Sequence, residues 1–138
     1  MERTFLDTNV LVYADDLDAG PKREVAREVL REALVSGCGV VSTQVLQEFF
    51  VITTGKLGVD PAAAREKVAL LGRLDLVVVR LELILGAIDL LRIHRLAFWD
   101  ALVVKAAAAA GCTRLLTEDL NAGEVIDGVR VVNPFAGA

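Results

Sequence analysis

The chain alternates between short apolar runs and longer stretches in which apolar residues recur every three or four positions with charged residues between them. The second pattern is typical of helices that bury one face. Proline or a capping hydroxyl opens several of these stretches, and glycine closes them, as at helix ends. The short runs lack polar alternation, which is typical of strands that are covered on both faces.

These signals predict strands over residues 3–7, 39–42, 76–79, 114–117 and 128–132. They predict helices over residues 21–36, 43–55, 61–74, 81–93 and 98–110. Residues 9–16 fit either a continuation of the first strand or a helix. Strands that alternate with helices predict an α/β fold of three layers, α/β/α, with a central parallel sheet of about five strands. We expect a single domain over residues 1–138.

The sequence also predicts which side chains of two helices face the core. We expect the helix over residues 81–93 to face inward with the stripe Leu81, Leu85, Ile88 and Leu91. Apolar side chains of this segment that stay exposed are candidates for a dimer face. Trp99 is expected in the core, because it stands at helical spacing from Val103.

Composition excludes several classes of protein. Of 138 residues, 54% are hydrophobic and 25% are charged, which excludes a disordered chain. No run reaches the ~18 uncharged apolar residues of a membrane span, so we expect no membrane association. The net charge of −4 argues against a general electrostatic binder of nucleic acid. The start of the chain lacks the features of a signal peptide, and Cys38 and Cys112 fit buried thiols, so we expect a cytoplasmic protein.

Carboxylates follow the predicted strands at several points far apart in the sequence. Asp7 ends the first strand, Glu48 lies on the helix after the second, and Asp100 lies in the first turn of the helix over residues 98–110. Glu118 and Asp119 directly follow the strand over residues 114–117. Ligands of open parallel sheets bind outside the carboxyl ends of the strands, so these acids are candidates for one site.

The positions of two acids on their helices favour a bound cation. Glu48 lies ~60° and Asp100 ~80–100° from the centre of the apolar stripe of its helix, where a side chain is partly desolvated. Clustered carboxylates also repel one another, and a divalent cation removes both costs. Oxygen ligands select magnesium or manganese. Each acid alone also fits a turn, a helix cap or a solvated surface position.

Four segments together resemble the PIN-domain ribonucleases, and most closely the VapC-type toxins of bacterial and archaeal toxin–antitoxin pairs. They are FLDTNVLVY at residues 5–13, Glu48 within a helix, FWDALVVKAA at residues 98–107 and LTEDL at residues 116–120. The resemblance covers essentially the whole chain, in order and length.

The resemblance implies a metal-dependent endoribonuclease that hydrolyses single-stranded or looped RNA and uses Mg²⁺, for which Mn²⁺ can substitute. It implies that Asp7 and Asp100 are the core metal ligands, and that Glu48 and Asp119 are catalytic acids that bind through water or a second ion. Supporting roles fall to Thr8, Asn9, Thr117 and Glu118. It also implies an antitoxin protein, whose C-terminal segment blocks the acidic site, and a homodimer.

Other interpretations remain beside this one. Arg95 and Lys105 are candidates for contacts with the RNA backbone. The alternative function is a catalytically inactive PIN-like module that binds RNA or protein, which the complete set of acids disfavours. A receiver domain would need an aspartate after the third strand, where the chain has Val79 and Arg80. A dehalogenase-like phosphatase would need a second aspartate at the position of Asn9.

Overall fold

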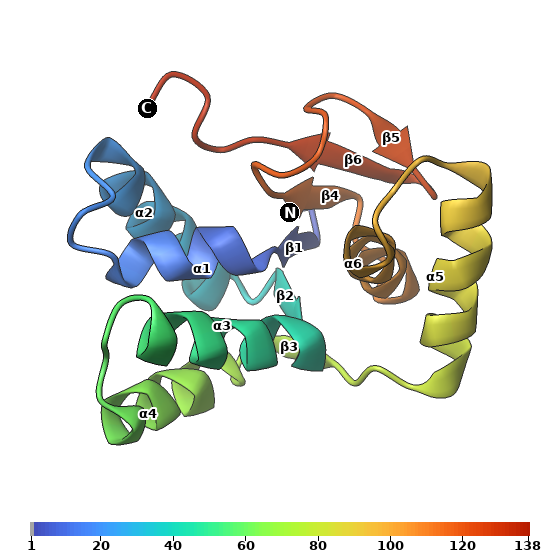
Figure 1. Cartoon of the computed structure of the whole chain (residues 1–138). Coiled ribbons are helices and arrows are strands. Elements are labelled where there is room, and N and C mark those ends of the chain that lie inside the picture. Colours follow the sequence, from blue (N-terminus) through green and yellow to red (C-terminus); the bar gives the residue numbers. More distant parts are fainter. Residues whose placement is uncertain (1) are drawn as a thin grey trace.

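The short apolar runs form a six-stranded sheet between two layers of helices in the computed structural model, which describes residues 2–138 (Figure 1). The strands are β1 (Thr4–Leu6), β2 (Gly39–Ser42), β3 (Asp75–Val77), β4 (Arg114–Leu116), β5 (Val125–Ile126) and β6 (Val129–Val132). Their order is β3-β2-β1-β4-β6-β5, and every neighbouring pair is parallel except β5 with β6. All residues of β1 and β2 are buried, as their lack of polar alternation predicts.

Six helices cover the two faces of the sheet. They are α1 (Thr8–Asp15), α2 (Pro21–Ser36), α3 (Thr43–Gly55), α4 (Pro61–Leu71), α5 (Leu81–Ile93) and α6 (Phe98–Ala109). Helices α1 to α4 pack together on one side of the sheet, and α5 and α6 pack together on the other (Figure 1). The ambiguous segment after β1 is helical, because the carboxylate of Asp7 caps it by accepting a hydrogen bond from the Thr8 N–H at 2.7 Å. The predicted three-layer fold is confirmed.

The sheet has one strand more than the sequence predicts. Strand β5 contains two residues, too few to produce an apolar pattern, and pairs antiparallel with β6. Asp127 and Gly128 connect the two strands, and both have positive φ angles, of 53° and 79°. This is the backbone of a type I′ hairpin turn, for which Asp-Gly is a preferred sequence. Gly128 therefore belongs to the turn and not, as predicted, to the strand.

The expectation that Leu81, Leu85 and Ile88 face inward is wrong. Leu81 and Leu85 are 66% and 52% exposed, and Ile88 is exposed as well. The buried residues of α5 are Leu83, Ala87 and Leu90. Because α5 is apolar around most of its circumference, the sequence offers two stripes at helical spacing. Packing against α6 buries the second one.

The expectation that Trp99 lies in the core is also wrong, because 62% of its surface is exposed. Its ring contacts Phe98 edge to face, with 5.1 Å between the ring centroids, while Val103 is buried as expected. Of the cysteines, Cys112 is buried and Cys38 is half-buried. Within residues 2–138, none of the helices is long and apolar enough to cross a bilayer.

The packing of α2 against β2 generates a stability prediction. A methyl group added at Gly39 would lie 2.5 Å from the Cβ of Ala33 and 3.0 Å from a methyl of Leu74. We expect Gly39→Ala to lower the free energy of unfolding by about 1–3 kcal/mol in denaturant titrations, because the crowding involves a packed core.

Gly86→Ala is the matched control. The added methyl would meet only the Cε, Cγ and Cδ atoms of the Lys105 side chain, which can move aside. Alanine also has about 1 kcal/mol better helix propensity than glycine, so we expect an unchanged or raised stability. Equal destabilisation by both substitutions would contradict the packing described for β2.

Candidate active site

The order in which the chain adds strands to the sheet reverses between β1 and β4. From β1 the chain builds β2 and β3 outward on one side, and it then returns to place β4 against the other side of β1. The crevice outside the carboxyl ends of two such strands is where open α/β sheets bind ligands. Asp7 directly follows β1, and Thr117 and Asp119 follow β4.

A cavity of about 250 Å³ opens at this edge. Its walls come from α1, α3, the first turns of α6 and the loop after β4. Four acids that the sequence singles out, Asp7, Glu48, Asp100 and Asp119, all line it, together with Thr8 and Asn9. The structure therefore brings together carboxylates from four separate segments of the chain.

Asp7 is the most buried of these acids, with 6% of its surface exposed. Its Oδ1 accepts a hydrogen bond from the Thr8 N–H at 2.7 Å, and its Oδ2 accepts one from the Thr117 hydroxyl at 2.8 Å. Burial raises the pKa of Asp7 to about 6, and the charges of Asp119 and Glu48 add to the increase. The two hydrogen bonds lower the pKa of Asp7 but do not cancel the increase. The folded chain thus holds a carboxylate whose charge is incompletely compensated.

Asn9 and Thr117 connect Asp7 to Asp119. The Asn9 amide nitrogen donates to Asp119 Oδ2 at 3.0 Å and to the Thr117 hydroxyl at 3.2 Å. The Asp119 N–H donates to the same hydroxyl at 3.1 Å. The other end of the Asn9 amide, Oδ1, is buried and has no hydrogen-bond partner among residues 2–138. Such an oxygen beside two carboxylates suits a bound cation or its water.

The remaining two acids lie on the helices that flank this network. The Thr8 hydroxyl donates to Glu48 Oε1 at 2.9 Å and so fixes the half-buried Glu48 against the start of α1. Asp100 stands in the first turn of α6. Burial raises the pKa of Asp100, and the negative charge of Asp119 raises it further.

Among residues 2–138, no cationic side chain forms an ion pair with any of the four acids. Every ion pair found among residues 2–138 involves other carboxylates. Within the same residues, no three His, Cys, Asp or Glu side chains converge closely enough to enclose a metal ion by themselves. This arrangement does not fit an all-protein cage of the kind that holds structural zinc. It does fit Mg²⁺, which keeps several waters and takes one or two carboxylates.

Glu118 lies outside the cavity and has partners of its own. The Tyr13 hydroxyl and the Lys22 ammonium group both donate to it, the latter at 2.9 Å. Burial alone would raise the pKa of Glu118, but the two hydrogen bonds and the charge of Lys22 together outweigh it and hold the pKa below its usual value. Lys22 also lies 5.0 Å from the centre of the Tyr13 ring. This cluster anchors the loop that carries Asp119.

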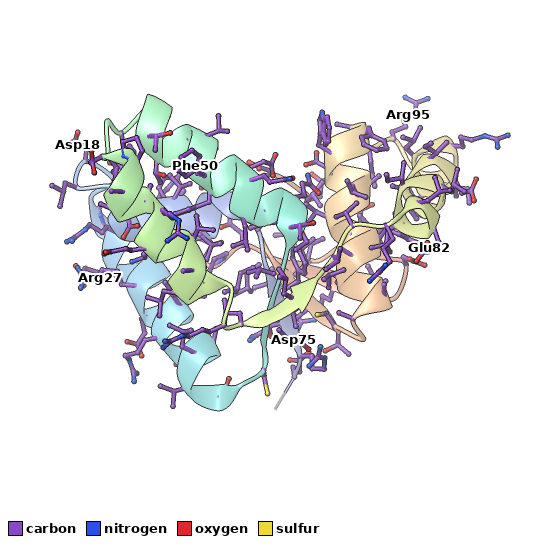
Figure 2. All side chains as sticks on the ribbon, turned by 90° about the horizontal axis from the view of Figure 1, so that it is seen from below. Asp18, Arg27, Phe50, Asp75, Glu82 and Arg95 are labelled. Carbon is purple, nitrogen blue, oxygen red and sulfur yellow. The ribbon has the colours of Figure 1, made fainter. Side chains whose placement is uncertain are left out.

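The two predicted RNA contacts differ in their positions. Arg95 lines a second cavity, of about 340 Å³, which shares Asp100 and Asp119 with the first. In Figure 2 its side chain points away from the rest of the molecule, on the opposite side of the view from Arg27. Lys105 lines neither cavity and pairs with Asp127 at 3.0 Å. Arg95 thus lines a neighbouring cavity that shares two of the acids, and Lys105 lies away from both cavities.

One face of α3 supplies residues that the sequence analysis missed. Gln44, Glu48, Ile52 and Lys56 follow one another at intervals of four residues, and all line the cavity. This spacing places side chains in a row along a helix, so the position of Glu48 could have revealed the others. Trp99 lines the cavity as well.

Comparison with known proteins identifies the family. The PIN domain family matches residues 4–126. The chain belongs to the PIN-domain family. No curated protein matches it in sequence.

Two solved structures share the fold of this PIN domain. One is VapC20 of Mycobacterium tuberculosis, a toxin that cleaves the sarcin–ricin loop. It has a TM-score of 0.68 and 18% identity, over 81% of this chain and 86% of that chain. The other is a toxin–antitoxin complex from Klebsiella pneumoniae. It has a TM-score of 0.69 and 19% identity, over 96% of this chain and 98% of that chain.

The buried charge of Asp7 predicts a stabilising substitution. The pKa of Asp7 lies above its unfolded value of 3.8, so the metal-free fold loses stability as the pH rises from about 4 to about 6. Asp7→Asn removes the charge and keeps a side chain that caps helices well. We expect it to raise the free energy of unfolding of the metal-free chain at pH 7 by about 2–3 kcal/mol, with the gain fading toward pH 4.

Asp60→Asn is the control for this experiment. Asp60 caps α4 by accepting a hydrogen bond from the Ala62 N–H at 3.1 Å, and it is exposed. We expect this substitution to change stability by no more than about 0.5 kcal/mol at either pH. Destabilisation by Asp7→Asn in EDTA at pH 7 would show that the charge of Asp7 is well compensated without metal.

Proposed function

We propose that this PIN domain is a Mg²⁺-dependent endoribonuclease that acts as the toxin of a toxin–antitoxin pair. The observation that carries the proposal is the convergence of Asp7, Glu48, Asp100 and Asp119 on one cavity without a cationic partner. Membership in the PIN family supports it, since PIN-domain nucleases typically use divalent metals. The structural likeness to a toxin that cleaves the sarcin–ricin loop agrees with it.

In this proposal Asp7 and Asp100 would hold the metal directly, and Glu48 and Asp119 would bind through water or a second ion. These residues would hold a magnesium ion, which would supply a water of lowered pKa and a positive charge to stabilise the phosphate oxygens. Thr117 and Asn9 keep Asp7 and Asp119 oriented through the hydrogen bonds described above. The donor set consists of oxygens, so Mn²⁺ substitutes for Mg²⁺.

The other residues act on the substrate. The first turn of α6 presents backbone N–H groups beside Asp100, where a phosphate is favoured by the helix dipole. Arg95 contacts the RNA backbone from the second cavity. Lys56, directly after α3, supplies a positive charge at the wall of the cavity of the acids.

An antitoxin protein and a second copy of the chain are the proposed partners. The toxin–antitoxin complex with the same fold supports the antitoxin. The exposed apolar side chains of α5, Leu81, Leu85 and Ile88, support a dimer, because such residues are favoured at interfaces between protein chains. We place the protein in the cytoplasm.

Cleavage of a cellular RNA pool tests the proposed activity. We expect the purified chain to cut RNA in Mg²⁺ and in Mn²⁺ and to be inactive in EDTA. We expect Asp100→Asn to lower the rate by more than about a hundredfold, since even residues that only orient metal ligands contribute 10- to 100-fold. The control is Asp89→Asn, an exposed aspartate on α5 outside both cavities, which should cut like the wild type.

Two results would contradict the proposal. Cutting that persists in EDTA or in Asp100→Asn would show that the carboxylates are not needed. RNA that binds without being cut in either metal would favour the catalytically inactive PIN-like module instead.

A further inference from the structure

The cavity of the four acids has an aromatic wall that the proposed chemistry does not use. Trp99 lines it, directly before Asp100 in the sequence, and 62% of the Trp99 surface is exposed. Consecutive Cα atoms are about 3.8 Å apart, so the indole ring and the metal-binding carboxylate start from adjacent points of the same helical turn. Leaving so large an apolar ring in water is unfavourable, and this indicates a ligand that covers it.

The charge of the cavity indicates what kind of contact an RNA substrate needs there. Five acids line the cavity, namely Asp7, Asp16, Glu48, Asp100 and Asp119, and Lys56 is the one lysine or arginine among its lining residues. The whole chain carries a net charge of −4. Attraction between basic side chains and phosphates, which dominates most binding of nucleic acids, is therefore weak at this site. Stacking of a base on an aromatic ring is independent of the net charge and supplies affinity where phosphate contacts do not.

A second observation at the same wall indicates an absent ligand. Gln44 is 6% exposed and lines the same cavity, and its Nε2 donates to the Trp99 carbonyl oxygen at 3.3 Å. The Oε1 of Gln44 is buried and has no hydrogen-bond partner among residues 2–138. Buried polar atoms without a partner are rare in folded proteins. Gln44 thus links the start of α3 to the backbone of Trp99, and it carries a buried acceptor that nothing in residues 2–138 satisfies.

We propose that the indole of Trp99 is a platform on which a nucleobase of single-stranded RNA stacks, next to the acids whose bound metal would engage the adjoining phosphate. The inference rests on the proposed nuclease function and adds to it the way in which the substrate is held. A stacked base requires an unpaired nucleotide, which agrees with the single-stranded or looped RNA that the family resemblance implies. Because every base has a π face, Trp99 tolerates all four bases, and an N–H group at the edge of the base is a suitable donor for Gln44.

Trp99 is better explained by a nucleobase than by a dimer face. It lines the cavity of the acids, whereas the exposed leucines of α5, Leu81 and Leu85, do not. A ring that served only a dimer face would have no reason to share a wall with four metal-binding carboxylates. The experiments below include the dimer as an outcome.

Tryptophan fluorescence tests the stacking directly, because Trp99 is the one tryptophan in the chain. The probe is a short single-stranded RNA of mixed sequence with a fluorescent end label, added in Ca²⁺, another cation that prefers oxygen ligands. We expect saturable quenching of the Trp99 emission by this RNA. An abasic ribose-phosphate chain of equal length is the control, and it should leave the emission unchanged. Binding of the RNA, measured by label anisotropy, without quenching would overturn the inference, and so would the absence of binding.

Substitution gives an independent measurement. We expect Trp99→Ala to weaken RNA binding about tenfold or more in label anisotropy, and Trp99→Phe to keep most of the affinity, since a phenyl ring also stacks. Val35→Ala, at an exposed apolar residue of α2 that lines neither cavity, should bind RNA like the wild type. Unchanged RNA affinity in Trp99→Ala, together with a loss of the dimer in sedimentation, would assign the ring to a protein interface and overturn the inference.

The two proposals fail separately in these experiments. Metal-dependent cleavage without quenching would keep the nuclease and reject the platform. Quenching without cleavage in Mg²⁺ or Mn²⁺ would keep the platform and reject the nuclease.

Discussion

Repulsion among carboxylates at the edge of β1 and β4 is the constraint around which this site is built. Asp7 is buried beside Asp119 and Glu48, and no lysine or arginine within residues 2–138 pairs with any of them. Neutral donors partly offset the cost: the hydroxyls of Thr8 and Thr117 donate to Glu48 and Asp7. They fix the positions of the acids without neutralising them. What remains is an excess of negative charge that a divalent cation relieves.

The fold imposes this arrangement through its topology. Strand β4 lies beside β1 although more than 100 residues separate them, as the register Phe5 to Leu115 records. The loops that follow the two strands therefore meet at one edge. Helices α3 and α6 add carboxylates from either side, and a row of side chains at intervals of four residues along α3 extends the wall of the cavity. The scaffold around the acids is rigid, since Phe5, Leu6 and Leu115 are fully buried.

The sequence predicted the layers of the fold and the four acids that line the cavity. It did not predict the buried face of α5, strand β5 or the partners of Glu118 and Lys105. Strand and helix alternation and the acids at strand ends are local signals, and both were visible before the structure. The sequence does not reveal which face of α5 is buried, because its two apolar stripes are equivalent until α6 packs against one of them. Strand β5 was too short to leave a pattern. Glu118 is held by Tyr13 and Lys22, and Lys105 pairs with Asp127. These partners lie far from Glu118 and Lys105 in the sequence, so the spacing of residues along the chain does not predict them.

The central claim is that a cation completes this site, and the effect of Mg²⁺ on folding stability tests it most directly. At pH 7, Mg²⁺ should raise the free energy of unfolding of the wild-type chain as its concentration increases, by about 2.7 kcal/mol at a hundred times the dissociation constant. Asp7→Asn should start from a higher stability in EDTA and gain little from the metal, because it lacks a charged ligand. Wild-type stability that does not respond to Mg²⁺, or an equal gain in both proteins, would contradict the account.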